Sequence, residues 1–154
     1  MYCSLSDIEE KLDPDKVIEL TNDANRAIAD IDLTDEDDAC LVIVNSCIKA
    51  AETEINTELG ARYMVPFSAV PDQIVIWCTE IAIYQLFLRR RRQLMDETVL
   101  AQYKLVKTAM KRLADGYGEL IGAVAIQNEA GSGNIQGNKK AIDKIFTKKM
   151  TDQF

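Results

Sequence analysis

The sequence contains no histidine, the side chain that most often acts as a general base near neutral pH. Its four cysteines lack Cys-x-x-Cys spacing, which excludes zinc fingers and c-type haem attachment. Cys40 and Cys47 lie seven residues apart on one predicted helix, about 10 Å along its axis, too far for a disulfide. We therefore expect buried reduced thiols, and no catalytic centre, metal site or cofactor.

Long apolar runs are also absent. The most apolar stretch, residues 74–88, is interrupted by Thr79, Glu80 and Gln85, and it is shorter than the roughly 20 residues of a membrane span. Met1 is followed by a polar, acidic segment and not by a signal peptide. These features predict no membrane partner and a helix buried in the centre of a bundle.

Acidic residues gather near the N-terminus. Residues 1–38 carry 13 acidic and 3 basic side chains, whereas residues 39–116 carry 8 and 10, and residues 117–154 carry 4 and 5. The net charge of −10 in the first segment repels nucleic-acid phosphates and acidic lipids alike. Its ordinary interpretation is a solvated acidic surface.

Apolar periodicity predicts an all-α fold, a small bundle of three long helices. Side chains at helical spacing form one stripe in each helix: Leu41, Val44, Ile48, Ala51, Ile55 and Leu59; then Ile74, Trp77, Ile81, Tyr84 and Leu88; then Val99, Tyr103, Val106, Met110 and Leu113. The second helix is apolar almost all round, and the third is predicted over residues 96–115.

Two short helices are predicted before this bundle. A capping box at residues 4–7 opens the first, to about residue 12, and Asp13-Pro14 opens the second, to about residue 20. A single helical turn is expected at residues 24–28, and a second capping box, residues 34–37, is expected to start the first long helix.

The linker between the first two long helices carries the strongest backbone signals. Gly60 is expected to close the preceding helix in the left-handed conformation. Pro66 keeps Val65 extended, and Pro71 is expected in the first turn of the next helix. The chain should therefore turn back on itself near residue 60.

Glycine is rare until the C-terminal part, where six of the seven glycines fall within residues 116–137. A short amphipathic pattern follows, with lysines on its other faces and an apolar set of Ile142, Ile145, Phe146, Met150 and Phe154. Ordering about 13 residues costs about 13–26 kcal/mol of backbone entropy, which exceeds the 8–12 kcal/mol or so gained by burying that set. We expect a helical domain at residues 1–116 and a flexible arm at residues 117–154 that orders on assembly.

Four consecutive arginines, Arg89, Arg90, Arg91 and Arg92, end the most apolar helix. Cations at a helix C-terminus satisfy its last carbonyls and its dipole. Four in a row point round nearly the whole circumference, so some must face outward. They could then contact acidic groups of a neighbouring subunit or nucleic-acid phosphates.

The chain resembles the Mu-like prophage head–tail joining family of tailed phages. The resemblance rests on Met-Tyr-Cys-Ser-Leu-Ser-Asp at residues 1–7, Ala-Ala-Glu-Thr-Glu-Ile at 50–55, Leu-Gly-Ala-Arg-Tyr at 59–63, Val-Pro-Phe at 65–67, Val-Pro at 70–71, Ile-Ala-Ile-Tyr at 81–84 before Arg89-Arg90, and Phe-Thr-Lys-Lys-Met at 146–150. It covers residues 1–115 and, more loosely, the last ten residues.

This resemblance implies a non-enzymatic adaptor that joins the DNA-filled head to the tail. Its expected partners are further copies of itself in a ring of twelve, the portal protein above, and tail or stopper proteins below. It would be assembled in the host bacterial cytoplasm and reside at the head–tail junction of the virion. The charge pattern adds a hypothesis of its own: acidic side chains of the N-terminal third line the channel, so that packaged DNA passes without sequence-specific binding.

The role of two linker residues and the function of the chain each have an alternative interpretation. Arg62 and Tyr63 are either structural pins of the linker or contacts between subunits. The alternative function is a small DNA-binding or packaging-regulator module that uses Arg89 to Arg92.

Overall fold

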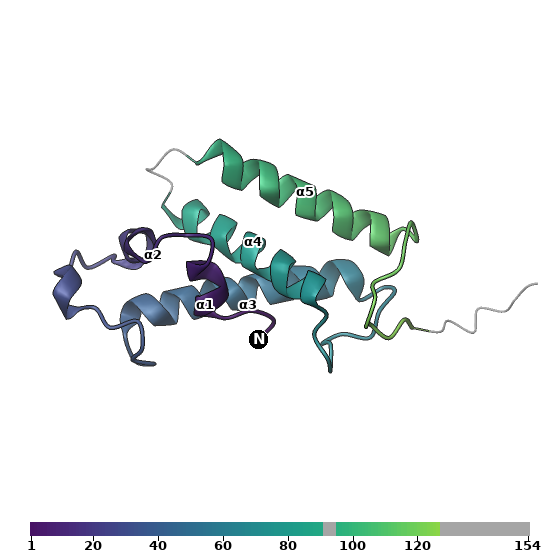
Figure 1. Cartoon of the computed structure of the whole chain (residues 1–154), viewed down its shortest axis with the longest axis horizontal. Helices are drawn as coiled ribbons and strands as arrows, with labels where there is room; N and C mark the ends of the chain where they lie inside the picture. The colour runs from purple at the N-terminus through teal and green to yellow at the C-terminus, as the bar shows by residue number, and fades with distance from the viewer. Residues whose placement is uncertain (91–94, 127–154) are drawn as a thin grey trace, which may run out of the picture.

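Three long helices form the body of the molecule (Figure 1). The structure, a computed structural model, describes residues 1–90 and 95–126. Its elements are α1 (Leu5–Glu9), α2 (Pro14–Thr21), the 3₁₀ turn η1 (Ile28–Asp30), α3 (Ala39–Leu59), α4 (Asp72–Arg89) and α5 (Glu97–Ala114). Within the described residues there is no strand, and an isolated antiparallel bridge joins Tyr63 to Ala125. The all-α bundle predicted from the sequence is confirmed.

Helix α4 is the central element of the bundle. It packs against α3 and α5, and the short helices α1 and α2 also contact it (Figure 1). Nine of its side chains are buried, including Ile74, Trp77 and Ile81. A helix with neighbours on several sides needs apolar side chains on several sides, which explains why its apolar residues do not form a single stripe.

Helices α3 and α5 each bury one stripe. All six residues of the predicted α3 stripe are buried. In α5, Val106 and Met110 are buried, whereas Val99, Tyr103 and Leu113 are partly buried and pack against the core. Helix α5 therefore covers the bundle from one side and keeps its other face in solvent.

Polar contacts attach α5 to the other two long helices. The rings of Tyr103 and of Tyr84 in α4 are stacked, with centroids 3.8 Å apart. The Tyr103 hydroxyl donates to Glu54 of α3 at 2.8 Å, and Lys107 forms ion pairs with Glu54 and Glu58. Burial, and then the hydrogen bond to Glu54, raise the pKa of Tyr103 to about 12.

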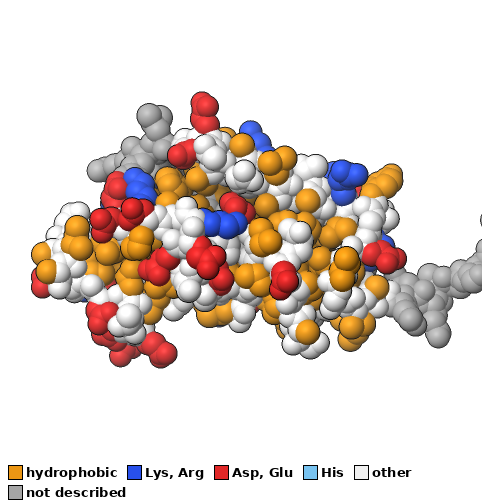
Figure 2. Space-filling view, in the orientation of Figure 1, with side chains coloured by type: hydrophobic (Ala, Val, Ile, Leu, Met, Phe, Trp, Pro, Cys, Tyr) orange, Lys and Arg blue, Asp and Glu red, His pale blue; other side chains and the backbone are white. Residues whose placement is uncertain are grey.

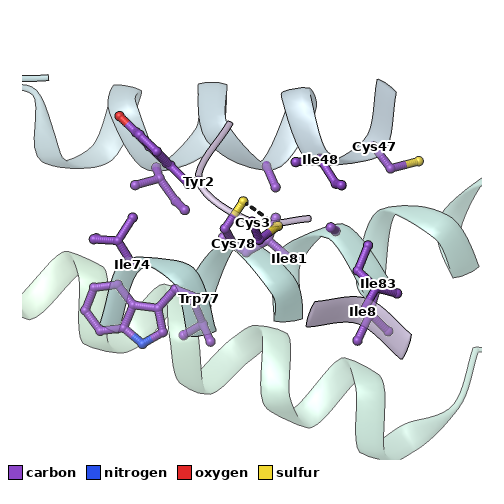
Figure 3. Packing of buried hydrophobic residues seen from close by; sticks show 14 of the residues in the cluster. Tyr2, Cys3, Ile8, Cys47, Ile48, Ile74, Trp77, Cys78, Ile81 and Ile83 are labelled. Carbon is purple, nitrogen blue, oxygen red and sulfur yellow. Dashed lines mark hydrogen bonds between the residues drawn. The ribbon is translucent and has the colours of Figure 1, made fainter. Parts of the chain in front are cut away.

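The N-terminal segment packs into the core ahead of α1. Tyr2 and Cys3 are buried between α3 and α4 (Figure 3). The Tyr2 hydroxyl donates to Asn56 Oδ1 and accepts a hydrogen bond from the Phe67 N–H at 3.0 Å. One side chain thus ties the chain start to both α3 and the linker.

Of the first three helix starts predicted from capping residues, two are confirmed. Ser4 and Asp7 form the expected capping box of α1, and Asp13 caps α2 with Pro14 at its first position. The capping box predicted at residues 34–37 is wrong. Asp38 caps α3 through its carboxylate, which accepts the Cys40 N–H at 2.8 Å.

Two other local predictions need correction. The turn expected at residues 24–28 lies at Ile28–Asp30, after Asn25 with its positive φ of 50°. Pro71 occupies the N-cap of α4, one residue before the predicted first turn, and its carbonyl accepts the N–H groups of Ile74 and Val75.

The left-handed helix end occurs at Gly116 and not at Gly60. Gly60 has φ −64°, and its role is close approach, because a Cβ there would lie 2.6 Å from the Asn56 carbonyl oxygen. Gly116 has φ +93° after α5, and the Tyr117 N–H donates to the Arg112 carbonyl at 2.8 Å. This is the Schellman arrangement, which favours glycine because the residue has no Cβ to clash.

Candidate interface residues

Arg62 connects the linker to the end of α5. Its guanidinium donates to the Leu113 carbonyl at 2.7 Å and lies 5.6 Å from the ring centroid of Tyr63. Carbonyls in the last turn of a helix have no partner within the helix, so a cation there is favourable. Arg62 thereby pins the linker to α5 within the same chain.

Tyr63 is buried in the same region, with 2% of its surface exposed. Its hydroxyl accepts the Leu120 N–H at 2.9 Å. Its neighbour Met64 donates its N–H to the Val124 carbonyl at 2.9 Å, and the Ile126 N–H donates to the Arg62 carbonyl at 2.8 Å. Residues 117–126, the first ten of the predicted arm, therefore lie against the linker. For Tyr63 the structure supports the reading as a structural pin.

Arg89 and Arg90 contact the acidic N-terminal third of their own chain. Both guanidinium groups donate to the Leu20 carbonyl near the end of α2, and Arg90 also donates to the Asn22 carbonyl at 2.8 Å. Asp23 forms ion pairs with both arginines. The charge complementarity expected between subunits is thus found within the subunit for these two residues.

The remaining predicted residues lie outside the part of the chain that the structure describes. They are Arg91, Arg92, Ile142, Ile145, Phe146, Met150 and Phe154.

An exposed apolar surface lies at the end of the molecule formed by the linker and residues 117–126. We call it the apolar end and define it by Met64, Tyr117, Ile121, Val124 and Ile126. Figure 2 shows apolar side chains on that end, beside the point where the described chain stops. Ile121 is 92% exposed and Tyr117 is 73% exposed, which is unusual for side chains of this size.

A groove of about 470 Å³ lies at the apolar end, between the start of α4, the end of α5 and residues 117–121. Trp77, Leu113 and Leu120 form much of its floor, and Tyr117 and Ile121 stand at its edge. The sequence predictions missed this surface. The only signal was a set of large apolar residues in a glycine-containing loop, a place where side chains are usually polar.

Most of the acidic side chains near the N-terminus face solvent. Ten of the 13 are exposed: Glu10, Asp13, Asp15, Glu19, Asp23, Asp30, Asp32, Asp35, Glu36 and Asp37. In Figure 2 acidic side chains gather over α2 and the loop before α3, at the opposite end from the apolar end. The expected acidic surface is present.

Asp38 is the buried exception among these acids. Its carboxylate pairs with Arg26 at 2.6 Å and accepts the N–H groups of Cys40 and Asp32. The hydrogen bond from Arg26, followed by that from Cys40, lowers the pKa of Asp38 to about 2. Asp38 therefore fixes the loop before α3 and is charged at neutral pH.

All four cysteines are buried free thiols, as the sequence indicated. Among the described residues, no group of three or more cysteine, aspartate and glutamate side chains is placed to bind a metal ion. None of the helices in the described ranges has the length and hydropathy that spanning a membrane requires.

Comparison with known proteins bears on this arrangement. A family model described as "Bacteriophage Mu, Gp36" matches residues 2–137. The match includes every helix described above, the linker and the apolar end. No curated protein matches the chain.

Proposed function

The chain belongs to the Gp36 family of bacteriophage Mu, and on that premise we propose that it is a structural head–tail connector. It would form a ring beneath the portal protein, receive tail or stopper proteins on the other side, and reside at the head–tail junction of the virion. The chain would act by binding and positioning and would catalyse no reaction. The ring would hold twelve copies, to match the portal.

The observation that carries this proposal is the apolar end. Large exposed apolar side chains that lie together, such as Tyr117 and Ile121, mark surfaces that another protein covers. We propose that a neighbouring copy of this chain covers them in the ring.

The intrachain contacts described above support a rigid subunit. Arg62, Tyr63 and the end of α5 fix the segment that carries the apolar end. A surface that is already ordered loses less conformational entropy on association, and it therefore binds more tightly. A ring also needs each subunit to present the same contact geometry, which a flexible segment would not do.

The acidic surface suggests the orientation of the subunit. We propose that the end formed by α2 and the loop before α3 faces the channel. Exposed carboxylates there would repel DNA phosphates, so that DNA could pass without being held. A ring structure with residues 1–38 on its outer rim would reject this orientation.

The DNA-binding alternative depends on the arginines that end α4. Arg89 and Arg90 are engaged by Asp23 and by carbonyls of the α2 end, so their charge is partly neutralised. Binding of duplex DNA by the isolated protein, weakening steeply between low and moderate salt, would favour that alternative over the connector.

The test is complementation of phage particles that lack this protein. Without it, we expect DNA-filled heads that leak DNA or fail to join tails, and the wild-type chain supplied in trans should restore complete particles. Ile121→Asp should fail to restore them, because it places a charge on the apolar end without disturbing the core.

Leu105→Asp is the matched control. Leu105 lies on α5 and is 63% exposed, so the same chemical change is made outside the apolar end. Normal virions without the protein would remove the connector function. Full rescue by Ile121→Asp would remove the apolar end as the contact surface.

A further inference from the structure

Two cysteines that are far apart in the sequence meet in the core. Cys3 lies in the N-terminal segment before α1, and Cys78 lies 75 residues later, in the middle of α4. Their Sγ atoms are 3.1 Å apart and within hydrogen-bond distance. Figure 3 shows the two sulfurs facing each other between the helices.

The neighbours of Cys3 in the chain hold its sulfur in this place. On one side, the Tyr2 hydroxyl is hydrogen-bonded to Asn56 and to the Phe67 N–H. On the other side, Ser4 caps α1. Cys78 is fully buried within α4. The pair is therefore built into the fold, since groups on both sides position it.

We propose that Cys3 and Cys78 form a disulfide when the protein meets an oxidising medium and stay as thiols in a reducing cytosol. The existing contact places the two sulfurs about 1 Å from bonding distance. Protein disulfides generally persist in oxidising compartments and are reduced in the cytosol. The bond would join the N-terminal segment covalently to the central helix.

Oxidised glutathione, or another small disulfide, supplies the oxidant. The Cys3 thiolate attacks one glutathione sulfur, which forms a mixed disulfide and releases one glutathione thiolate. The Cys78 thiolate then attacks the Cys3 sulfur, forms the Cys3–Cys78 bond and expels the second glutathione. Two electrons pass to the glutathione disulfide, and the two thiol protons end on the two reduced glutathione molecules.

The electrostatics of the pair give the two cysteines different roles in these two exchange steps. The side-chain hydrogen bond with Cys78 lowers the pKa of Cys3, whereas the pKa of Cys78 is raised by the same contact with Cys3 and by burial. The thiol with the lower pKa supplies the attacking thiolate. Cys3 also lies on the terminal segment, which can open locally without unfolding the bundle.

Cys40 and Cys47 provide an internal comparison. Both are buried free thiols of the same chain. They lie seven residues apart on α3, about 10 Å along its axis, and disulfide geometry excludes that separation. Exposure to the same oxidant should leave them unpaired.

The experiment uses the folded, fully reduced chain. It is incubated with oxidised glutathione, quenched with an alkylating agent under denaturing conditions, and measured by intact mass and peptide mapping. We expect two of the four thiols to resist alkylation, so that the intact mass falls by two hydrogens for the disulfide and rises by two alkyl groups only, and we expect a cross-linked peptide joining Cys3 to Cys78. The oxidised chain should also melt roughly 5–10 °C higher, because the bond closes a long loop.

Matched variants test the assignment. The double variant Cys40→Ser, Cys47→Ser should still form the bond, whereas Cys3→Ser should not form it. Four alkylated thiols after oxidation of the native chain would overturn the proposal, as would a bond to Cys40 or Cys47, or a bond that forms only in urea. The peptide map of the wild-type chain decides the question even if a variant fails to fold.

Discussion

The contact between Tyr63 and Leu120 offers the most direct test of how the apolar end is held in place. The change is Tyr63→Phe, which removes one oxygen and keeps the buried ring. The lost hydroxyl accepts the Leu120 N–H at 2.9 Å, in a place where Leu120 itself is 6% exposed. The variant therefore leaves a backbone donor buried without its acceptor.

The expected cost follows from that geometry. A buried donor that loses its acceptor costs about 1–3 kcal/mol, and partial opening of the loop brings the value toward the lower end. We expect the free energy of unfolding to fall by about 1–2 kcal/mol, with an unchanged denaturant slope. For a chain of this length the melting temperature should fall by about 3–6 °C.

Two measurements test this prediction. Urea unfolding monitored by the fluorescence of Trp77, the single tryptophan, gives the global stability. Trp77 lines the same groove as Leu120, so its emission also reports on the segment that moves. Amide hydrogen exchange of Leu120 gives the local effect and should accelerate in the variant.

Tyr117→Phe is the matched control, because Tyr117 is 73% exposed and belongs to the same segment. Its effect should stay within about 0.5 kcal/mol. The reasoning is refuted if Tyr63→Phe is equally neutral and the Leu120 amide keeps its protection. If the reasoning is correct, Tyr63→Phe should also restore complete particles less well than the wild-type chain, since the apolar end is no longer held in one geometry.

Three further predictions concern stability and its dependence on pH. The pKa of Asp38 is lowered to about 2 in the folded state, so the stabilising contribution of its carboxylate is present above pH 4 and is lost as the pH falls from about 4 to 2. Arg26→Met removes the ion-pair partner, and it should reduce this loss of stability in acid when urea unfolding is measured at a series of pH values. The pKa of Tyr103 is raised to about 12, so its stabilising contribution is present below pH 10 and is lost between about pH 10 and 12. Burial also raises the pKa of Tyr2, so absorbance at about 295 nm should show more than one tyrosine that ionises late, and Tyr103→Phe should remove one of them. Ile55 of α3 is fully buried, so Ile55→Ala should lower the free energy of unfolding by about 2–5 kcal/mol in urea, and a cost below 1 kcal/mol would contradict the packing around it.

The long helices were predictable because their signal is local and repeats many times. Each of α3, α4 and α5 contains several turns of apolar side chains at helical spacing, and one misplaced residue changes little. Leu88 shows the limit of this signal, since it fits the α4 pattern and is 42% exposed. Near a helix end, fewer neighbouring elements remain to cover a side chain.

The helix ends were harder to predict, because neighbouring residues compete for the same role. The loop before α3 offers several acidic and hydroxyl side chains, and the choice of Asp38 over Thr34 depends on Arg26, twelve residues earlier. Gly60 and Gly116 both follow helices, and only the structure shows which one has a positive φ. Local sequence lists the candidates, and tertiary contacts select among them.

The candidate interface was the least predictable part. The sequence singled out Arg62 and Tyr63, but their partners Leu113 and Leu120 lie more than 50 residues away. The pairing of Arg89 and Arg90 with the α2 end and of Cys3 with Cys78 has the same origin. Such contacts depend on how the helices cross, which periodicity alone does not determine.

The packing of the subunit limits where a ring contact can form. Helix α4 packs against α3, α5, α1 and α2 of its own chain, and Arg89 and Arg90 at its end are engaged by Asp23 and by the Leu20 carbonyl, so this region leaves less free surface for a partner. The acidic ends of neighbouring subunits would repel one another if they were placed face to face. The apolar end combines exposed apolar area with a backbone that Arg62 and Tyr63 hold in place, so a contact there gains hydrophobic free energy at a small entropic cost.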